Sequence, residues 1–274
     1  MKSKCPICPH RCTLVPEETG LCGARKNADG KIVCDSYGKI SAAALDPIEK
    51  KPLRRFFPGM LIFSVGSYGC NLNCPFCQNH RIAKPLDKLN LTNVPPDALV
   101  QKALSFKEQG NIGIAYTYNE PLIGYEYVMD CAQLAHSHGL KNVLVTNGYI
   151  EKAPLSKLLP FIDAINIDLK SFNSEFYKKL GGDIETVKNT ILLAASEVHI
   201  EVTNLIIHDE NDSPSEMENL ASWLSDISTE IPLHVSRFFP CYKYSDKAQT
   251  PVETVYALAD IARKHLSYVY TGNC

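Results

Sequence analysis

Three cysteines with the spacing C-x3-C-x2-C occur in the segment GCNLNCPFCQN, as Cys70, Cys74 and Cys77. Three thiolates can supply three of the four ligands that a structural zinc ion takes. They can also occupy three corners of a 4Fe–4S cluster and leave one iron open to another ligand. The zinc site needs a further protein ligand, whereas the cluster can take a small molecule. The identity of the fourth ligand therefore decides what chemistry this segment performs.

Charged residues later in the sequence favour the cluster. Glu120 lies in YTYNEP, and Asp168 and Lys170 lie in INIDLKSF, and each of these residues follows an apolar run. Carboxylate and ammonium side chains together suit the two charged ends of an amino acid, and Pro121 starts a helix whose N-terminus favours a carboxylate. A solvated ion network at the rim of a sheet is the alternative. The position of these residues after successive apolar runs favours a binding site.

A second set of cysteines lies near the N-terminus, at Cys5, Cys8, Cys12 and Cys22, with the spacing C-x2-C-x3-C-x9-C. Four thiols are enough to complete a structural zinc site. An auxiliary iron–sulfur cluster and unliganded thiols are the alternatives, and Cys34 is a possible substitute for one of the four. The spacing departs from the ferredoxin run C-x2-C-x2-C-x3-C, which argues against an electron-relay domain.

The apolar runs before these groups predict six strands, which alternate with amphipathic helical segments. Strands that alternate with helices form a parallel sheet with right-handed crossovers, and six such units are too few for a closed eight-stranded barrel. The sequence thus predicts an α/β fold, a partial (β/α)6 barrel of the TIM type with a small Cys-rich N-terminal subdomain. We expect the subdomain and a linker in residues 1–59 and the barrel in residues 60–274. The predicted strands are 61–66, 112–117, 142–147, 164–169, 198–207 and 233–238.

The overall composition is that of an ordinary globular protein. The formal net charge of −2 over 274 residues gives no general electrostatic reason to expect nucleic acid or an anionic membrane as a partner. No run approaches the length of a membrane span, and the N-terminus lacks the apolar segment of a signal peptide. The clustered cysteines are more typical of metal binding in a reducing compartment than of disulfides. We therefore expect a cytoplasmic protein.

The cysteine motif resembles that of the radical SAM superfamily, in which S-adenosylmethionine (SAM) binds the open iron of a 4Fe–4S cluster. Together, several segments resemble the AmmeMemoRadiSam subgroup, which is related to pyruvate formate-lyase activating enzyme. The similarity extends over nearly the whole chain. The segments that carry it are CPICPHRC, CGARKNADGKI, DPIEKKPL, GCNLNCPFCQN, YTYNEP and INIDLKSF.

The resemblance implies roles for individual residues. Phe76 matches the aromatic position that packs near the adenine, and YTYNEP takes the place of a GGEP-like motif that contacts the SAM amino group. In this motif Tyr118 and Asn119 stand where the family has two glycines, and Glu120 matches its acidic residue. The DLK segment, with Asp168 and Lys170, resembles the one that holds the methionyl group in glycyl-radical activating enzymes. His234 matches a histidine of the sixth strand that approaches the ribose, although a buried structural histidine is an equal alternative.

The resemblance also implies an activity, namely reductive cleavage of SAM to a 5′-deoxyadenosyl radical that abstracts hydrogen. Activation of a glycyl-radical partner is the leading expectation, and modification of a small molecule or of another protein residue is the second. A non-catalytic iron–sulfur electron carrier is a remote alternative, since it has no use for Glu120, Asp168 and Lys170. The expected partners are an electron donor such as flavodoxin or ferredoxin and a possible protein substrate, without nucleic acid or membrane. No catalytic residue for the hydrogen-abstraction step emerges from the sequence.

Overall fold

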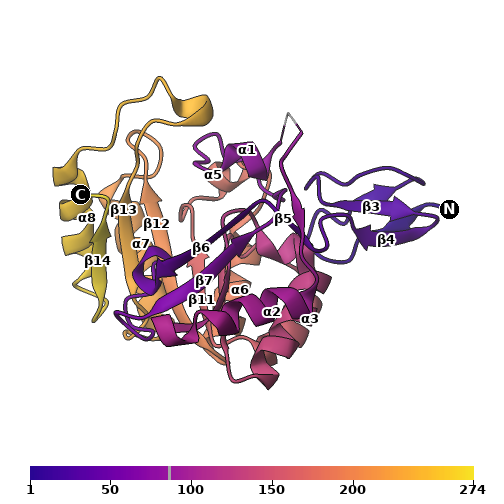
Figure 1. Cartoon of the computed structure of the whole chain (residues 1–274). Coiled ribbons are helices and arrows are strands. Elements are labelled where there is room, and N and C mark those ends of the chain that lie inside the picture. The colour runs from indigo at the N-terminus through magenta and orange to yellow at the C-terminus, as the bar shows by residue number, and fades with distance from the viewer. Residues whose placement is uncertain (86–87) are drawn as a thin grey trace.

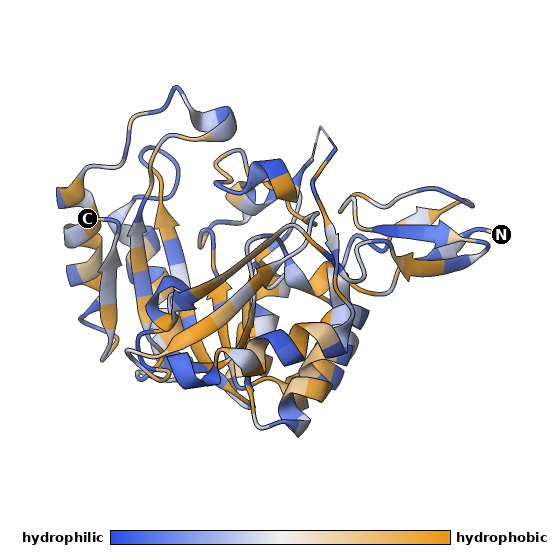
Figure 2. Cartoon of the chain, in the orientation of Figure 1, coloured by the Kyte–Doolittle hydropathy of each residue, from blue (hydrophilic) through white to orange (hydrophobic). Residues whose placement is uncertain are grey.

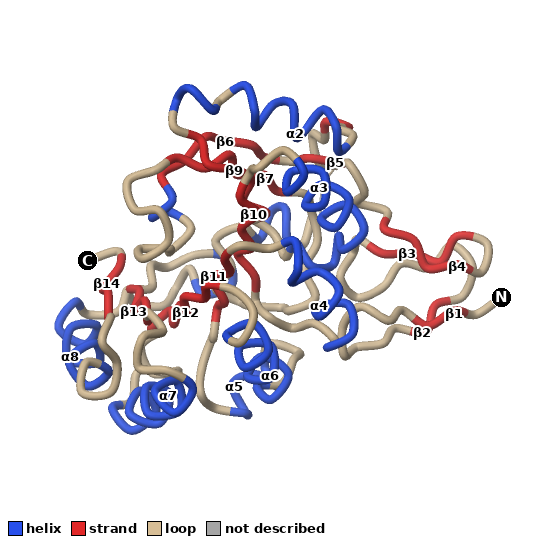
Figure 3. The backbone as a smooth tube through the Cα atoms, turned by 90° about the horizontal axis from the view of Figure 1, so that it is seen from below, coloured by secondary structure: helices blue, strands red, loops and turns tan. Residues whose placement is uncertain are grey.

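The computed structural model describes residues 1–85 and 88–274. Eight strands form one sheet in the order β14-β13-β12-β11-β10-β9-β7-β6, and all neighbours are parallel except β6 and β7. Figure 3 shows the strands as an open arc with the helices on its outer side. The partial barrel is therefore confirmed, with all six predicted strands. The bounds are β6 (Ala42–Pro47), β7 (Leu61–Gly66), β9 (Asn111–Tyr116), β10 (Lys141–Thr146), β11 (Ala164–Asp168), β12 (His199–Ile206), β13 (Leu233–Arg237) and β14 (Val269–Gly272).

Two of the long helices that cover the arc, α6 and α7, begin at residues whose side chains cap them. Asp183 and Ser213 accept hydrogen bonds from backbone N–H groups in the first turns of α6 and α7, which satisfies donors that have no partner within a helix. None of the helices that the structure describes is both long enough and apolar enough to cross a membrane. The bounds are α1 (His80–Ala83), α2 (Pro96–Ser105), α3 (Tyr125–Ser137), α4 (Lys152–Leu158), α5 (Ser174–Lys179), α6 (Ile184–Ala195), α7 (Pro214–Ile227) and α8 (Val252–Ala262).

The two faces of the sheet differ because side chains alternate along each strand. In β7, Phe63 and Val65 belong to the main apolar cluster with the helices, and the arrow of this strand is mainly orange in Figure 2. The inner face of β12 carries Glu201 and Thr203, and Thr203 lines the cavity inside the arc. Polar side chains of this strand therefore enter the barrel.

The sequence predicts a linker in residues 46–59, and residues 48–59 of it pack inside the arc. Ile48, Leu53 and Phe56 form an apolar cluster with residues of β7, β9, β10 and β11. The backbone N–H groups of Arg54 and Arg55 donate to the Glu201 carboxylate, at 2.9 and 2.7 Å. The division of the chain at residue 59 stays a prediction, but β6 and this segment contribute to the barrel.

The N-terminal subdomain consists of short hairpins and loops beside the barrel (Figure 1). The guanidinium group of Arg25 is buried and forms a two-pronged ion pair with Glu126 of α3, at 2.7 and 2.6 Å. This contact attaches the subdomain to the outer helices. The strands are β1 (Ser3–Lys4), β2 (Thr13–Leu14), β3 (Arg25–Ala28) and β4 (Lys31–Cys34), and β5 (Lys39–Ile40) pairs with β8 (Thr92–Asn93).

Candidate functional site

A cavity of about 560 Å³ lies inside the arc, toward the carboxyl ends of the parallel strands. Residues from β7, β9, β10, β11, β12 and β13, or from the loops that follow them, contribute to its wall. All nine side chains predicted to bind the cluster or SAM line this cavity: Cys70, Cys74, Phe76, Cys77, Asn119, Glu120, Asp168, Lys170 and His234. The structure thus brings the predicted residues together, and their binding roles stay a prediction.

The three cysteines of the loop after β7 are free thiols. Burial raises the pKa of Cys74 to about 11 and also raises the pKa values of Cys70 and Cys77, while the nearby ammonium of Lys170 lowers those of Cys74 and Cys77. Within residues 1–85 and 88–274, no three His, Cys, Asp or Glu side chains are gathered as metal ligands. A thiolate would need compensation in this buried environment, which a metal provides.

Two donors already point at the Cys70 sulfur. The backbone N–H of Leu72 lies 3.4 Å from Cys70 Sγ, and Asn147 Nδ2 lies 3.6 Å from it. Hydrogen bonds to ligand sulfurs stabilise the thiolate form and tune iron–sulfur clusters. Three cavity-lining thiols, two N–H donors on one sulfur and the neighbouring cation therefore fit a 4Fe–4S cluster.

The Glu120 carboxylate is fully engaged by the protein. It accepts hydrogen bonds from the backbone N–H of Leu122, the Thr146 hydroxyl and the backbone N–H of Asn147, at 3.0, 2.7 and 2.8 Å. Burial is the largest influence and raises its pKa to about 7. Since Glu120 itself caps the short helix that starts at Pro121, that helix end is no longer open to the carboxylate of a ligand.

Asp168 and Lys170 form an ion pair of 2.7 Å at the end of β11. Burial opposes the charge on Lys170, but Asp168 and the Cys74 thiol more than offset this effect and raise the pKa of Lys170. The backbone N–H of Lys170 donates to the Tyr177 hydroxyl at 3.0 Å, which fixes the backbone of this turn. A rigid carboxylate–ammonium pair can exchange its internal contact for the amino and carboxylate groups of an amino acid.

His234 lines the cavity but also serves the barrel. Its Nε2 donates to Glu201 at 2.6 Å, and His199 donates to the other carboxylate oxygen at 3.1 Å. Both alternatives for His234 thus find support, since it is buried and partnered while it borders the cavity. Glu201 lies on the neighbouring strand β12, 33 residues before His234 in the chain.

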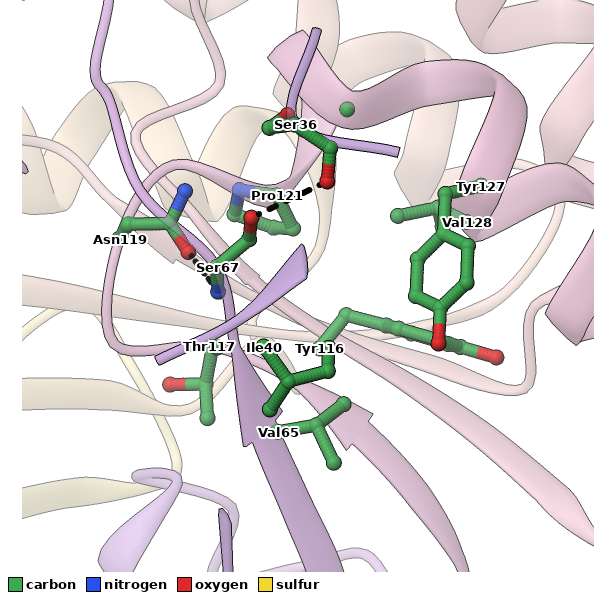
Figure 4. A pocket seen from close by; sticks show the side chains of 12 residues that line it. Ser36, Ile40, Val65, Ser67, Tyr116, Thr117, Asn119, Pro121, Tyr127 and Val128 are labelled. Atoms are coloured by element: carbon green, nitrogen blue, oxygen red, sulfur yellow. Dashed lines mark hydrogen bonds between the residues drawn. The ribbon is translucent and has the colours of Figure 1, made fainter. Parts of the chain in front are cut away.

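Asn119 and its neighbours join the loop after β9 to the cysteine loop. Asn119 Oδ1 accepts from the backbone N–H of Ser67 at 2.9 Å, and its Nδ2 donates to the carbonyl groups of Tyr68 and Gly69. Asn119 also borders a small, mostly apolar cavity of about 30 Å³, shown in Figure 4, which has room for about one water molecule. Of the two cavities that Asn119 borders, the one with the cysteines is much the larger, at about 560 Å³.

The N-terminal subdomain contacts the cysteine loop directly. The backbone N–H of Cys70 donates to the carbonyl of Cys22 at 3.0 Å, and His10 Nε2 donates to the carbonyl of Asn71 at 2.8 Å. Lys84 Nζ donates to the carbonyl groups of Leu21 and Cys70, at 3.3 and 2.6 Å. Sequence reasoning missed these contacts because they depend on how the subdomain folds back.

Two other residues near the cysteines were missed as site residues. Asn147, which donates to Cys70 Sγ, is the last residue of the predicted strand 142–147 and follows β10 directly, and this position was the available signal. Cys241 donates to the carbonyl of Phe76 at 3.1 Å from the loop after β13. A lone cysteine so far along the chain carries no sequence signal for this contact.

Known proteins share parts of this sequence. An uncharacterized protein of Methanocaldococcus jannaschii, MJ0808, is 41% identical over 277 residues, which cover 99% of this chain and 81% of that protein. The (2S)-3-sulfopropanediol dehydratase activating enzyme of Klebsiella oxytoca is 25% identical over 224 residues, 79% of this chain and 69% of that enzyme.

The fold has a counterpart among solved structures. A radical SAM methyltransferase from Sphaerobacter thermophilus aligns with a TM-score of 0.61 and 18% identity, over 79% of this chain and 67% of that one. At this identity the similarity concerns the fold alone. The family model described as the radical SAM superfamily matches residues 64–224, from β7 into α7. The chain therefore belongs to the radical SAM superfamily.

Proposed function

We propose that this radical SAM enzyme acts as an activase, generating a glycyl radical in a partner protein. The observation that carries the proposal is the single cavity in which three thiols, an acid–base pair and an aromatic side chain meet. Similarity to a dehydratase activating enzyme supports the activase role. An electron donor such as flavodoxin or ferredoxin and a glycine-bearing loop are the partners that this role requires.

Some residues of the site would bind the cluster and SAM, and others would shield them from water. Cys70, Cys74 and Cys77 would hold the 4Fe–4S cluster, and Asp168 with Lys170 would hold the amino-acid end of SAM. When bound, the cluster and SAM together supply a one-electron cleavage of the S–C5′ bond and thereby a radical able to abstract hydrogen. The walls of the arc would limit the access of bulk water to the reacting groups.

The buried carboxylate of Glu120 has a supporting task. It accepts hydrogen bonds from Thr146 and Asn147, and Asn147 in turn donates to Cys70 Sγ and to Asn71 Oδ1. This chain of contacts fixes the direction of the Cys70 thiol relative to the loop after β9. We therefore assign Glu120 to positioning, in addition to any contact with the SAM amino group.

The N-terminal cysteines are proposed to hold a structural zinc ion. Cys5, Cys8 and Cys22 are buried free thiols, and burial raises the pKa of Cys8 to about 11. Zinc would replace the lost protons and complete a small subdomain that has little apolar core. Metal analysis of a Cys70→Ala/Cys74→Ala/Cys77→Ala variant tests this assignment. One zinc per chain supports it, iron indicates an auxiliary cluster, and no metal refutes it.

The first test of the activity is 5′-deoxyadenosine formation by anaerobically reconstituted protein with SAM and dithionite. The matched control is Cys74→Ala, and Cys131→Ala in α3 controls for the loss of a thiol away from the cavity. Product that only Cys74→Ala abolishes supports the radical SAM chemistry. A cluster-loaded protein that fails to bind SAM would refute it.

The activase role needs its own experiment, because SAM cleavage does not identify the substrate. Incubation with a candidate glycyl-radical enzyme should give the electron paramagnetic resonance signal of a glycyl radical. SAM cleavage that instead accelerates with a small molecule, or that leaves a different modified residue, would favour the second function over activation.

A further inference from the structure

Tyr118 has a backbone conformation that is rare for a residue with a side chain. Its φ angle is +71°, in the left-handed region where a Cβ atom crowds the backbone. Glycine adopts this conformation freely. The residue borders the large cavity and lies two positions before Glu120. Something in the structure must therefore hold Tyr118 in place.

Two buried charged groups hold the Tyr118 side chain. Its hydroxyl donates to Asp46 Oδ2 at 2.9 Å, and Lys51 Nζ donates to the same oxygen at 2.9 Å. Lys51 Nζ also lies 4.8 Å from the centre of the Tyr118 ring, within the range of a cation–π contact. The Lys51 side chain is 4% exposed and that of Asp46 is 13% exposed. Both anchors come from the segment that the sequence presented as a linker.

The neighbouring strand is shaped to accept this conformation. A Cβ atom on Gly66, the last residue of β7, would lie 2.8 Å from the Thr117 carbonyl oxygen and 2.8 Å from Tyr118 Cβ. No side chain fits at such distances. The close approach of Gly66 and Tyr118 brings the loop after β9 against the start of the cysteine loop.

The backbone around Tyr118 connects to both ends of the cysteine loop. The Tyr118 carbonyl accepts from Asn79 Nδ2 at 2.7 Å, two residues beyond Cys77. The next residue, Asn119, accepts from the backbone N–H of Ser67, as Figure 4 shows, and donates to the carbonyl of Gly69. A change in the Tyr118 backbone would shift both attachments and the adjoining Glu120.

We propose that Tyr118 is a positioning residue, whose left-handed backbone is imposed by Asp46 and Lys51 and fixes Asn119 and Glu120 against the cysteine loop. In this chain an anchored tyrosine adopts the left-handed backbone conformation that a glycine would adopt without anchors. The inference rests on the proposed function, because it holds that this conformation serves SAM binding.

The test measures the dissociation constant (Kd) of SAM for three variants of Tyr118. Measurements use anaerobic, cluster-loaded full-length protein, with iron content and melting temperature recorded for each variant. Tyr118→Ala loses the anchors and still disfavours a positive φ, so the binding-competent fraction falls and Kd rises about tenfold. Tyr118→Gly loses the same anchors but adopts the conformation freely, so its Kd stays within about threefold of the wild type.

Tyr118→Phe is a milder variant that keeps the ring above Lys51 and loses only the bond to Asp46. Its Kd should rise about threefold, as expected for one lost hydrogen bond to a charged group that weakens the anchor without removing it. Tyr256→Ala, at an exposed tyrosine of α8, is the control and should leave Kd unchanged.

The order of the SAM affinities of the Tyr118 variants distinguishes an effect on the backbone conformation from a general loss of stability. Rescue of SAM binding by glycine relative to alanine supports the inference, because a purely structural loss would affect both variants alike. Equal affinities of Tyr118→Gly and Tyr118→Ala, or an unchanged Tyr118→Phe, would overturn this inference alone. Failure of the loaded wild-type protein to bind SAM would overturn the proposed function together with it.

Discussion

Replacement of Glu201 by alanine should weaken the fold more than any exposed substitution. The Glu201 side chain is fully buried and accepts four hydrogen bonds, from Arg54 N, Arg55 N, His199 Nε2 and His234 Nε2. Removal of the carboxylate leaves these donors in the barrel without their acceptor. Each buried donor without a partner costs about 1–3 kcal/mol, and loss of one member of a buried charged network costs about 3–5 kcal/mol. We expect a loss of about 4 kcal/mol.

The assay is equilibrium unfolding in guanidinium chloride at pH 7. A lower midpoint with an unchanged slope would show a loss of stability without a change in the denatured state. Glu197→Ala is the matched control, because Glu197 is an exposed glutamate just before β12 and should change the free energy of unfolding by less than about 0.5 kcal/mol. If Glu201→Ala unfolds within about 0.5 kcal/mol of the wild type, segment 48–59 is not held by this carboxylate.

The same carboxylate predicts how stability depends on pH. Burial opposes ionisation of Glu201, but the four hydrogen bonds outweigh burial and lower its pKa from 4.5 to about 2. Between these two values the unfolded chain binds more protons than the folded one, so stability rises with pH there. This contribution is fully present above pH 4.5 and is lost as the pH falls toward 2.

The magnitude of the pH effect follows from the shift. A pKa shift of this size corresponds to about 3 kcal/mol in the free energy of unfolding. The difference in free energy of unfolding between wild type and Glu201→Gln should therefore be smaller at pH 3 than at pH 6. A difference that stays constant across this range would contradict the assignment of the low pKa to Glu201.

Two further predictions concern the contact between the N-terminal subdomain and the barrel. Gly69 and Gly59 both have positive φ angles, but only at Gly69 would a Cβ atom meet a neighbour, the Cys22 carbonyl oxygen at 2.5 Å. Gly69→Ala should therefore cost at least about 1 kcal/mol more than Gly59→Ala in thermal unfolding, and reduce iron retention after reconstitution; equal losses would refute the steric argument. Arg25→Met removes the donor to the Ile123 carbonyl and the partner of Glu126, whose side chain is 43% exposed and stays solvated. It should therefore cost about 2 kcal/mol in thermal unfolding, and a loss below about 0.5 kcal/mol would show that this contact does not hold the subdomain.

The barrel strands were predictable because their signal is local. Each of the six runs is short, apolar and followed by a helical period, and each strand begins or ends within about two residues of its predicted position. The strand β14 was missed because YVYTG is short and half-buried. The strand β6 was missed as part of the barrel, since AAALDP has small residues and pairs in the opposite direction to the rest of the sheet.

The candidate site was predictable to the extent that position along a strand determines position in space. Residues after parallel strands meet at one end of the sheet, which is why Cys70, Glu120, Asp168 and Lys170 were named together. The partners of these residues were not predictable in the same way. Hydrogen bonds such as that between Asn147 and Cys70 depend on side-chain direction, which no period in the sequence encodes.

Most of the site contacts that the sequence did not predict involve residues outside the predicted barrel. Asp46 and Lys51 hold Tyr118, and the carbonyl of Cys22 accepts the hydrogen bond of Cys70. All three lie in residues 1–59, where composition indicates a metal-bound subdomain and a linker. Buried polar groups require partners, so the anchors of the cavity must come from whichever segments cover it.

This arrangement has a consequence for the cysteine loop. The loop contacts the subdomain through Cys70 and Asn71, and the loop after β9 through Asn119 and Asn79. Displacement of one neighbour would leave polar groups of the loop without partners, at a cost of about 1–3 kcal/mol each. A change in the hairpins of the N-terminal subdomain should therefore alter the loop that carries the three thiols. This effect would be indirect, because none of the described residues of these hairpins lines the cavity.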